Sequence, residues 1–139
     1  MTKGQLEQFR SNQAEILELE HKLAHLGEDD SLIRSSVILD YRNGYGVPQA
    51  VVGYDRELET RYRKRYEKLL QKLRSECEDV DEFINQISDG IVRRIFRMRY
   101  IDGMSQERIA LKVHIDKSNV SRKIDNYLKV ATHATKATV

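Results

Sequence analysis

Residues 105–123 read SQERIALKVHIDKSNVSRK, and this stretch decides the fold of the last third of the chain. Ser105 is typical of a helix N-cap and predicts a helix over residues 106–113. Asp116 is a second cap residue and predicts a further helix over residues 117–130. Because only a tight turn fits between these two helices, they are expected to pack directly against each other.

The spacing of apolar residues across this turn predicts a helix-turn-helix. Two short helices that cross steeply need a small residue at their contact, which is Ala110. They also need an apolar residue in the turn, Ile115, and another one turn into the following helix, Val120. The turn position that is usually glycine in such modules is His114, which is therefore expected at positive φ with some strain.

The helix over residues 117–130 exposes polar and basic side chains at its N-terminal end. Such side chains are the usual readers of base edges in the major groove of double-stranded DNA. The residues expected to contact bases are Lys117, Ser118, Asn119, Ser121 and Arg122. The residues expected to contact phosphates are Lys123, Arg99 and Lys112. The alternative is a three-helix bundle with a solvated basic face and no ligand.

A helix over residues 91–101 is expected to precede this pair, and it is rich in arginine. At least one of its four arginines is expected to contact a phosphate group: Arg93, Arg94, Arg97 or Arg99. Residues 91–139 hold eleven Lys and Arg against four Asp and Glu, a balance of +7, although the whole chain carries only +2. Residues 1–90 carry the remaining −5. A basic module on an acidic remainder is typical of nucleic-acid binders with a separate assembly part.

Two stretches of this region carry a family resemblance. RMRYIDGMSQERIA at residues 97–110, followed by SNVSR at residues 118–122, resembles the promoter-reading C-terminal domain of bacterial sigma factors, and the likeness covers residues 91–130. The part before it, a Gly/Pro-containing loop and a charged helix, resembles phage late-gene transcription regulators of the RinA/ArpU type. The resemblance implies an activator that binds DNA upstream of phage genes, in the cytoplasm of a bacterial host. RNA polymerase is a candidate partner, but the chain lacks the other sigma-factor regions.

The N-terminal half predicts long amphipathic helices. Residues 5–27 form one helix with a coiled-coil seam, and Gly27 ends it. A short helix is expected through Ile33, Val37, Ile38 and Tyr41, and a loop over residues 42–54, where Asn43-Gly44 and Pro48 break the periodicity. No stretch predicts a strand.

A second long helix follows over residues 55–78, with a strongly charged outer face. Asp79-Val80-Asp81-Glu82 is typical of a capping box and predicts that a new helix starts there, ending at Asp89-Gly90. The two long helices are expected to fold back as a hairpin or to pair between chains. A homodimer through these helices is the expected assembly, because one short helix-turn-helix makes few contacts and two would read paired half-sites.

The predicted fold is therefore all-α, with long coiled-coil-like helices followed by a C-terminal helix-turn-helix domain. The expected segments are residues 1–54 (helix and loop), 55–89 (long charged helix and connecting helix), 90–131 (DNA-binding domain) and 132–139 (flexible tail).

Other functions find little support. Cys77 is the only cysteine, so neither an intrachain disulfide nor a structural zinc site is expected, which fits a reducing compartment. His21 and His25 lie four residues apart beside Glu18, but without a third strong ligand they are expected to be surface residues rather than a metal site. No catalytic constellation, signal-peptide core or membrane-spanning run is recognisable, so no enzyme, cofactor or membrane association is expected.

Two other functions remain open on the sequence. The chain would fit a phage packaging subunit of the small terminase type, in which a helix-turn-helix recognises the genome. It would also fit a sigma-like module that binds RNA polymerase or another protein without touching DNA.

Overall fold

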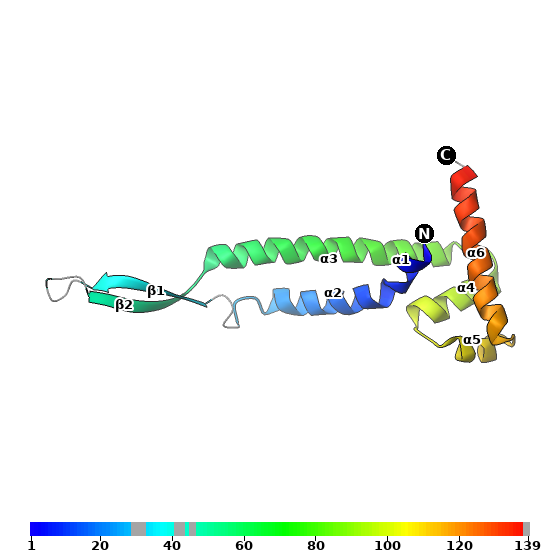
Figure 1. The fold of residues 1–139 in the computed structure, drawn as a ribbon, viewed down its shortest axis with the longest axis horizontal. Helices are drawn as coiled ribbons and strands as arrows, with labels where there is room; N and C mark the ends of the chain where they lie inside the picture. The colour runs from blue at the N-terminus through cyan, green and yellow to red at the C-terminus, as the bar shows by residue number, and fades with distance from the viewer. Residues whose placement is uncertain (29–32, 41–43, 45–46, 138–139) are drawn as a thin grey trace. The chain divides into compact units, whose positions relative to one another are not determined.

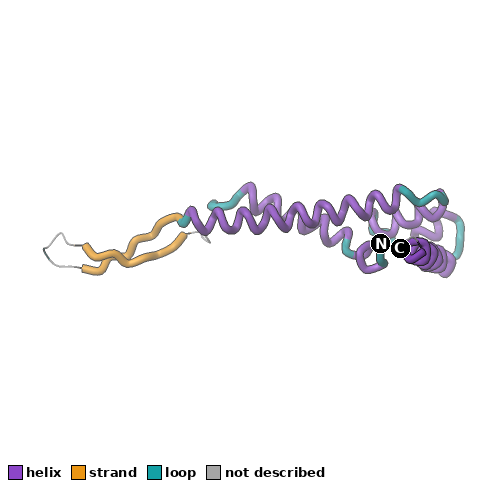
Figure 2. The backbone as a smooth tube through the Cα atoms, turned by 90° about the horizontal axis from the view of Figure 1, so that it is seen from above, coloured by secondary structure: helices purple, strands orange, loops and turns teal. Residues whose placement is uncertain are grey.

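The computed structural model describes residues 1–28, 33–40, 44 and 47–137. Most of these residues are helical, as predicted, and one antiparallel β-hairpin interrupts the helices (Figures 1 and 2). The helices are α1 (Lys3–Glu7), α2 (Phe9–Ala24), α3 (Arg56–Asn85), α4 (Gly90–Phe96), α5 (Gln106–Val113) and α6 (Lys117–Ala137). A π-helical turn, η2 (Arg97–Ile101), follows α4, and the strands are β1 (Ile33–Asp40) and β2 (Val47–Tyr54).

The chain divides into two compact units that do not follow its sequence order. Unit 1 combines Met1–Ile16 with Lys72–Val139, and unit 2 is Leu17–Gln71. Unit 1 therefore contains both ends of the described chain and all of the helices α4 to α6. The N-terminal residues, which the sequence analysis assigned to a separate segment, belong to the same compact unit as the C-terminal helices.

The core of unit 1 is one apolar cluster that draws on every helix of the unit. The fully buried side chains, all less than 2% exposed, are Leu6, Ile84, Ile87, Ile95, Phe96, Ile109 and Val120. Phe9 at 4% and Ile124 at 2% exposure belong to the same cluster. The aromatic rings contribute at the centre, because Phe96 lies 5.4 Å from Tyr127 and 6.3 Å from Phe83 between ring centroids.

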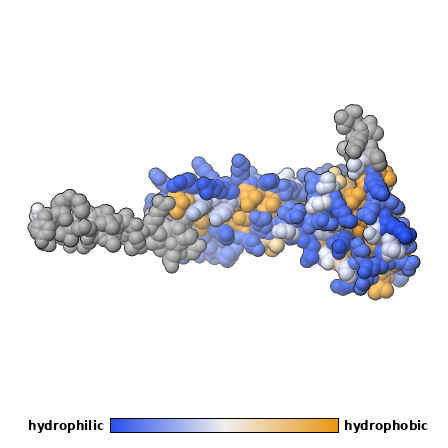
Figure 3. Space-filling model, in the orientation of Figure 1, coloured by the Kyte–Doolittle hydropathy of each residue, from blue (hydrophilic) through white to orange (hydrophobic). Residues whose placement is uncertain are grey.

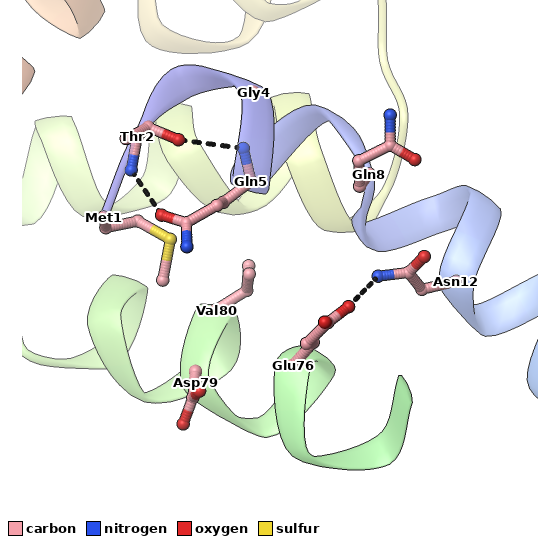
Figure 4. Close-up of a pocket in the computed structure, with 9 residues that line it drawn as sticks. All are labelled: Met1, Thr2, Gly4, Gln5, Gln8, Asn12, Glu76, Asp79 and Val80. Atoms are coloured by element: carbon pink, nitrogen blue, oxygen red, sulfur yellow. Dashed lines mark hydrogen bonds between the residues drawn. The ribbon is translucent and has the colours of Figure 1, made fainter. Parts of the chain in front are cut away.

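A capping box at the start of the chain holds α1 in place. The Thr2 hydroxyl accepts a hydrogen bond from the Gln5 backbone N–H at 3.2 Å, and the Gln5 side chain accepts one from the Thr2 N–H at 2.8 Å (Figure 4). The two bonds satisfy N–H groups that a helix start leaves without an internal partner. Thr-x-x-Gln is visible in the sequence, and it explains why helix begins at Lys3 rather than at the predicted residue 5.

The N-terminal helices also contact α3 within unit 1. The Asn12 side-chain amide donates to a carboxylate oxygen of Glu76 at 3.2 Å, beside a hollow of about 460 Å³ (Figure 4). Cys77, the next residue of α3, is buried, and its thiol lies 3.9 Å from the Phe9 carbonyl. Burial raises the pKa of this thiol, and the neighbouring Glu76 carboxylate adds to the rise. Cys77 is thus a packing residue, as its position on the apolar stripe predicted.

The predicted helix start at residues 79–82 is wrong, because α3 runs without interruption from Arg56 to Asn85. Its buried stripe continues through the supposed break, with Leu73, Cys77, Val80 and Ile84 spaced by three or four residues. The acidic residues of the supposed capping box are exposed on the outer face of the helix. The real cap lies at the other end, where Asp55 accepts from the Leu58 N–H at 2.9 Å.

The predicted short helix through residues 33–41 and the loop over residues 42–54 are also wrong, so the fold is not purely α-helical. β1 and β2 pair antiparallel, from Ile33 opposite Tyr54 to Asp40 opposite Val47. The described bend residue between them, Gly44, has φ of +83°. Tyr41 at the end of the predicted helix and residues 42–43 and 45–46 of the predicted loop lie outside the described residues. The β-branched residues of these stretches favour strands, but the strands also depend on pairing between the two segments. A search for helical periodicity does not reveal such pairing.

Unit 2 combines this hairpin with the adjoining parts of α2 and α3. Its buried side chains among the described residues are Leu19 and Leu70, both 5% exposed. The Lys22 ammonium lies 5.6 Å from the centre of the Tyr66 ring, and Tyr66 stacks on Tyr62 at 6.0 Å. The two long helices therefore contact each other inside this unit, in one chain.

The last helix is longer than predicted. α6 continues to Ala137, whereas the sequence predicted its end near residue 130 and a flexible tail over residues 132–139. The Thr132 hydroxyl donates to the Leu128 carbonyl at 2.7 Å, as it would inside a continuous helix. Residues 138–139 lie outside the described residues.

Because Leu6 lies in the core of unit 1, we expect Leu6→Ala to lower the free energy of unfolding by about 2–5 kcal/mol, the usual cost of a large-to-small change in a core. Leu111→Ala is the matched control, since Leu111 is 77% exposed in the same unit and its loss should change stability by about 0.5 kcal/mol or less. Urea unfolding followed by circular dichroism measures both. Equal effects of the two changes would show that the N-terminal residues do not belong to this core.

Candidate nucleic-acid interface

Helices α5 and α6 are held against each other by small and branched apolar side chains. Ile109 and Val120 are 0% exposed, and Ala110 is 8% exposed between them. A larger residue than alanine at position 110 would separate the two helices. These side chains fix α6 on the core, so its opposite face points to solvent.

The turn between α5 and α6 has the conformation that its sequence predicts. His114 has φ of 58° and ψ of 43°, in the left-handed region, and it is the one non-glycine residue with positive φ among the described residues. The N–H groups of His114 and Ile115 both bond to the Ala110 carbonyl, the latter at 3.1 Å. The turn closes α5 as a left-handed C-cap does, with histidine in the place of glycine.

Ser105 and Asp116 directly precede the two helices, and Ser105 caps its helix with its side chain. Ser105 has extended backbone, and its hydroxyl accepts from the Arg108 N–H at 3.3 Å. The Asp116 carbonyl accepts from the N–H groups of Asn119 and Val120 at 2.9 and 3.2 Å, which starts α6 at Lys117. Both helices therefore have the predicted first residue.

The structure brings six of the eight predicted DNA-contacting residues together on the first two turns of α6. Three of them are exposed: Lys117, Ser118 and Arg122. The other three are partly buried: Asn119, Ser121 and Lys123. The exposed side chains form a polar surface at the start of α6, and the buried Val120 fixes the other face of the helix on the core.

Lys117 already has a partner in the chain. Its ammonium lies 3.1 Å from a carboxylate oxygen of Glu107 on α5. Both side chains are more than half exposed, so the pair contributes little to stability and a stronger anion would displace Glu107.

The remaining two predicted contacts lie on other elements. Lys112 is exposed in the last turn of α5. Arg99 belongs to η2, and its guanidinium donates to the Met104 carbonyl at 3.3 Å. Among the described residues, neither side chain contacts the six residues on α6.

The other arginines of this region differ in whether their side chains hydrogen-bond to other described residues. Arg93 donates to the Ile87 carbonyl at 2.9 Å, and Arg97 donates to the Asn85 side chain at 3.0 Å, so both are bound to the end of α3 and the link after it. Arg94 is exposed, and within the described part of the chain it has no such partner. Of these three, Arg94 is the one that is available to an external phosphate.

The helix predicted over residues 91–101 is not uniform. After α4, the chain widens into the π-helical turn η2, where the Asp102 N–H bonds to the Arg97 carbonyl at 3.0 Å. Such turns are rare and often lie at functional sites. Tyr100 is buried here, and burial is the main cause that raises the pKa of its hydroxyl to about 12. The carboxylates of Glu7 and Asp125 also raise this pKa, and the Arg99 guanidinium lowers it. It is a neutral packing residue.

Sequence reasoning missed one exposed cation at this turn. The guanidinium of Arg10, from α2, lies against Gly103 in the space that a Cβ there would occupy. Nothing in the local sequence indicates this contact, since it depends on the packing of Phe9, the preceding residue, into the core of unit 1.

The other residues that the sequence singled out lie in unit 2. The rings of His21 and His25 are 4.4 Å apart, and His25 contacts Glu28 at 2.7 Å. Within the described parts of the chain, no group of three His, Cys, Asp or Glu side chains is arranged to hold a metal ion. Among the helices that the structure describes, none has the length and apolar character needed to cross a membrane.

Helices α4 to α6 define the chain as a predominantly helical protein whose C-terminal module presents a polar helix to solvent. The chain belongs to the family described as "Protein of unknown function (DUF722)", whose model matches residues 11–132. No curated protein and no solved structure matches the chain.

Since the left-handed conformation costs a residue other than glycine about 1–2 kcal/mol, His114→Gly should remove strain from the turn. The extra freedom of glycine in the unfolded chain offsets about 0.5–1 kcal/mol of this gain. We expect a net rise in the free energy of unfolding of about 0.5 kcal/mol or more.

Lys112→Gly is the control for this change, because a glycine inside the exposed face of α5 should lower stability by about 1 kcal/mol. Urea unfolding measures both variants. A destabilised His114→Gly protein would mean that the turn does not have the left-handed geometry.

Proposed function

We propose that the chain is a sequence-specific DNA-binding regulator of transcription, which reads the major groove with residues 117–130 of α6. The resemblance to sigma factors and to phage late-gene regulators favours activation of phage genes as its biological role. RNA polymerase is then a proposed partner, and the cytoplasm of the bacterial host is the proposed location.

The observation that carries this proposal is the polar surface on the first two turns of α6. A reading helix needs side chains with several hydrogen-bonding groups on one accessible face and a rigid support on the other. Arg122 suits bidentate pairing with guanine, and Asn119 suits adenine. Val120 and Ile124, 0% and 2% exposed, provide the support because they anchor the other face of the helix.

The charge distribution supports the same function. Residues 91–139, with their balance of +7, would displace counterions from the phosphate backbone and so gain affinity for any DNA. On the face in Figure 3, hydrophilic residues cover most of unit 1 and hydrophobic residues form separate patches. A surface of this kind suits a charged ligand better than a large apolar partner.

Self-association through the long helices is part of the proposal. One helix-turn-helix makes few base contacts, whereas a dimer would read two half-sites. Leu17 and Leu69 in unit 2 are 67% and 36% exposed, so this unit retains apolar surface that a second chain would cover. A chain that stays monomeric at high concentration in analytical ultracentrifugation would contradict the dimer.

The test of DNA binding is selection from fragments of the source genome at two salt concentrations. We expect a preferred fragment whose affinity falls with salt but which keeps its advantage over random DNA. Uniform binding that salt abolishes, or no binding, would contradict a sequence-specific regulator and would direct attention to RNA polymerase or another protein partner.

Arg122→Ala should reduce the discrimination between the preferred site and a site changed at one base pair, by about 1–3 kcal/mol. Lys129→Ala is the matched control, since Lys129 is an exposed cation further along the same helix. Fluorescence anisotropy with the two DNA sites measures both variants. An equal loss of affinity for both sites in Arg122→Ala would show that Arg122 contacts phosphate rather than a base.

A further inference from the structure

The turn between η2 and α5 gathers cations from two distant parts of the sequence. Arg10 lies in the first turn of α2, directly after Phe9, which is 4% exposed in the core of unit 1. Because Phe9 is anchored, the backbone from which Arg10 extends is fixed. Its guanidinium reaches Gly103, a residue with φ of +71° and no side chain to exclude it.

Arg99 reaches the next residue of the same turn. Its guanidinium donates to the Met104 carbonyl at 3.3 Å, which holds the end of this long side chain at the turn. Two exposed guanidinium groups, one from α2 and one from η2, therefore lie at the neighbouring residues Gly103 and Met104.

No ion pair between described residues neutralises these two charges. Asp102 is the carboxylate within the turn, and Glu7 is the acidic residue nearest to Arg10 in the sequence. Within the described residues, neither carboxylate forms an ion pair with Arg10 or Arg99. Two like charges that lie at neighbouring residues without counter-ions favour the binding of an anion at that turn.

The position of the turn indicates which kind of anion would bind to these two guanidinium groups. It directly precedes α5, and in helix-turn-helix complexes the helix before the reading helix crosses the DNA backbone. Guanidinium groups are well suited to phosphate oxygens because they can donate two parallel hydrogen bonds. A phosphate of the same DNA that α6 reads would therefore meet this turn.

We propose that Arg10 binds the DNA phosphate backbone together with Arg99, so that the N-terminal helices form part of the DNA interface. This proposal rests on the proposed function, since it assigns an additional contact to the same complex. It adds a residue from outside residues 91–130, the part of the chain that resembles a sigma-factor domain. The N-terminal segment thus has a role in binding as well as in the core.

The test is the salt dependence of DNA binding by the full chain with Arg10→Gln. Loss of one phosphate contact lowers the slope of log affinity against log salt by about 0.9, which corresponds to about an eightfold weaker affinity at 0.1 M salt. We expect this loss to be equal for the preferred fragment and for random DNA, because phosphate contacts carry no sequence information. Arg10→Lys should retain most of the slope.

Lys72→Gln is the control, since it removes one cation from an exposed position of α3 in the same unit. It should bind DNA with the wild-type slope. Urea unfolding of each variant shows whether a loss of affinity comes from a loss of stability.

The outcomes separate this proposal from the proposed function. Wild-type DNA binding with an unchanged slope in Arg10→Gln would overturn the role of Arg10 alone. A reduced affinity with an unchanged slope and lower stability would also overturn it, because Arg10 would then act only in packing. No DNA binding by the wild type would overturn both proposals.

Discussion

The ring of Phe96 lies where α3, α4 and α6 meet. It contacts Phe83, Tyr100 and Tyr127 at centroid distances of 6.3, 5.7 and 5.4 Å, and it is fully buried. Because these contacts fix α6 relative to the rest of unit 1, they also fix the position of the polar residues at its start. The exposed surface of α6 therefore depends on a core whose residues come from both ends of the sequence, Leu6 included.

Local signals in the C-terminal third were sufficient to predict where α5 and α6 begin and the conformation of the turn between them. Ser105 marks a helix start in any context, since its hydroxyl replaces a missing backbone acceptor. His114 was expected at positive φ because it occupies the turn position that is usually glycine in helix-turn-helix modules, and the structure has it there. Such features depend on the few residues on either side, so they can be predicted without knowledge of the tertiary contacts. The DNA-binding role of the α6 residues stays a prediction.

Features that depend on distant partners were not predicted. The strand Ile33–Asp40 exists through its pairing with Val47–Tyr54, and neither stretch shows a sustained alternation by itself. The acidic residues at 79–82 have the composition of a helix start, but the apolar stripe of α3 continues past them. Likewise, the contact of Arg10 with Gly103 follows from packing at Phe9 and has no local signature. In each case a tertiary contact outweighed a local preference.

The discontinuous make-up of unit 1 limits how this protein can be divided. A segment that contained residues 90–139 alone would lack Leu6, Phe9, Val80 and Ile84, and it would expose the apolar surface that they cover. Gene fusion or recombination that transfers only the C-terminal helices would thus yield an unstable fragment. A transferable unit would require residues 1–16 to be joined to residues 72–139, for example by a designed linker that replaces residues 17–71. In the sequence, unit 2 is thus an insertion between the two segments that together form unit 1.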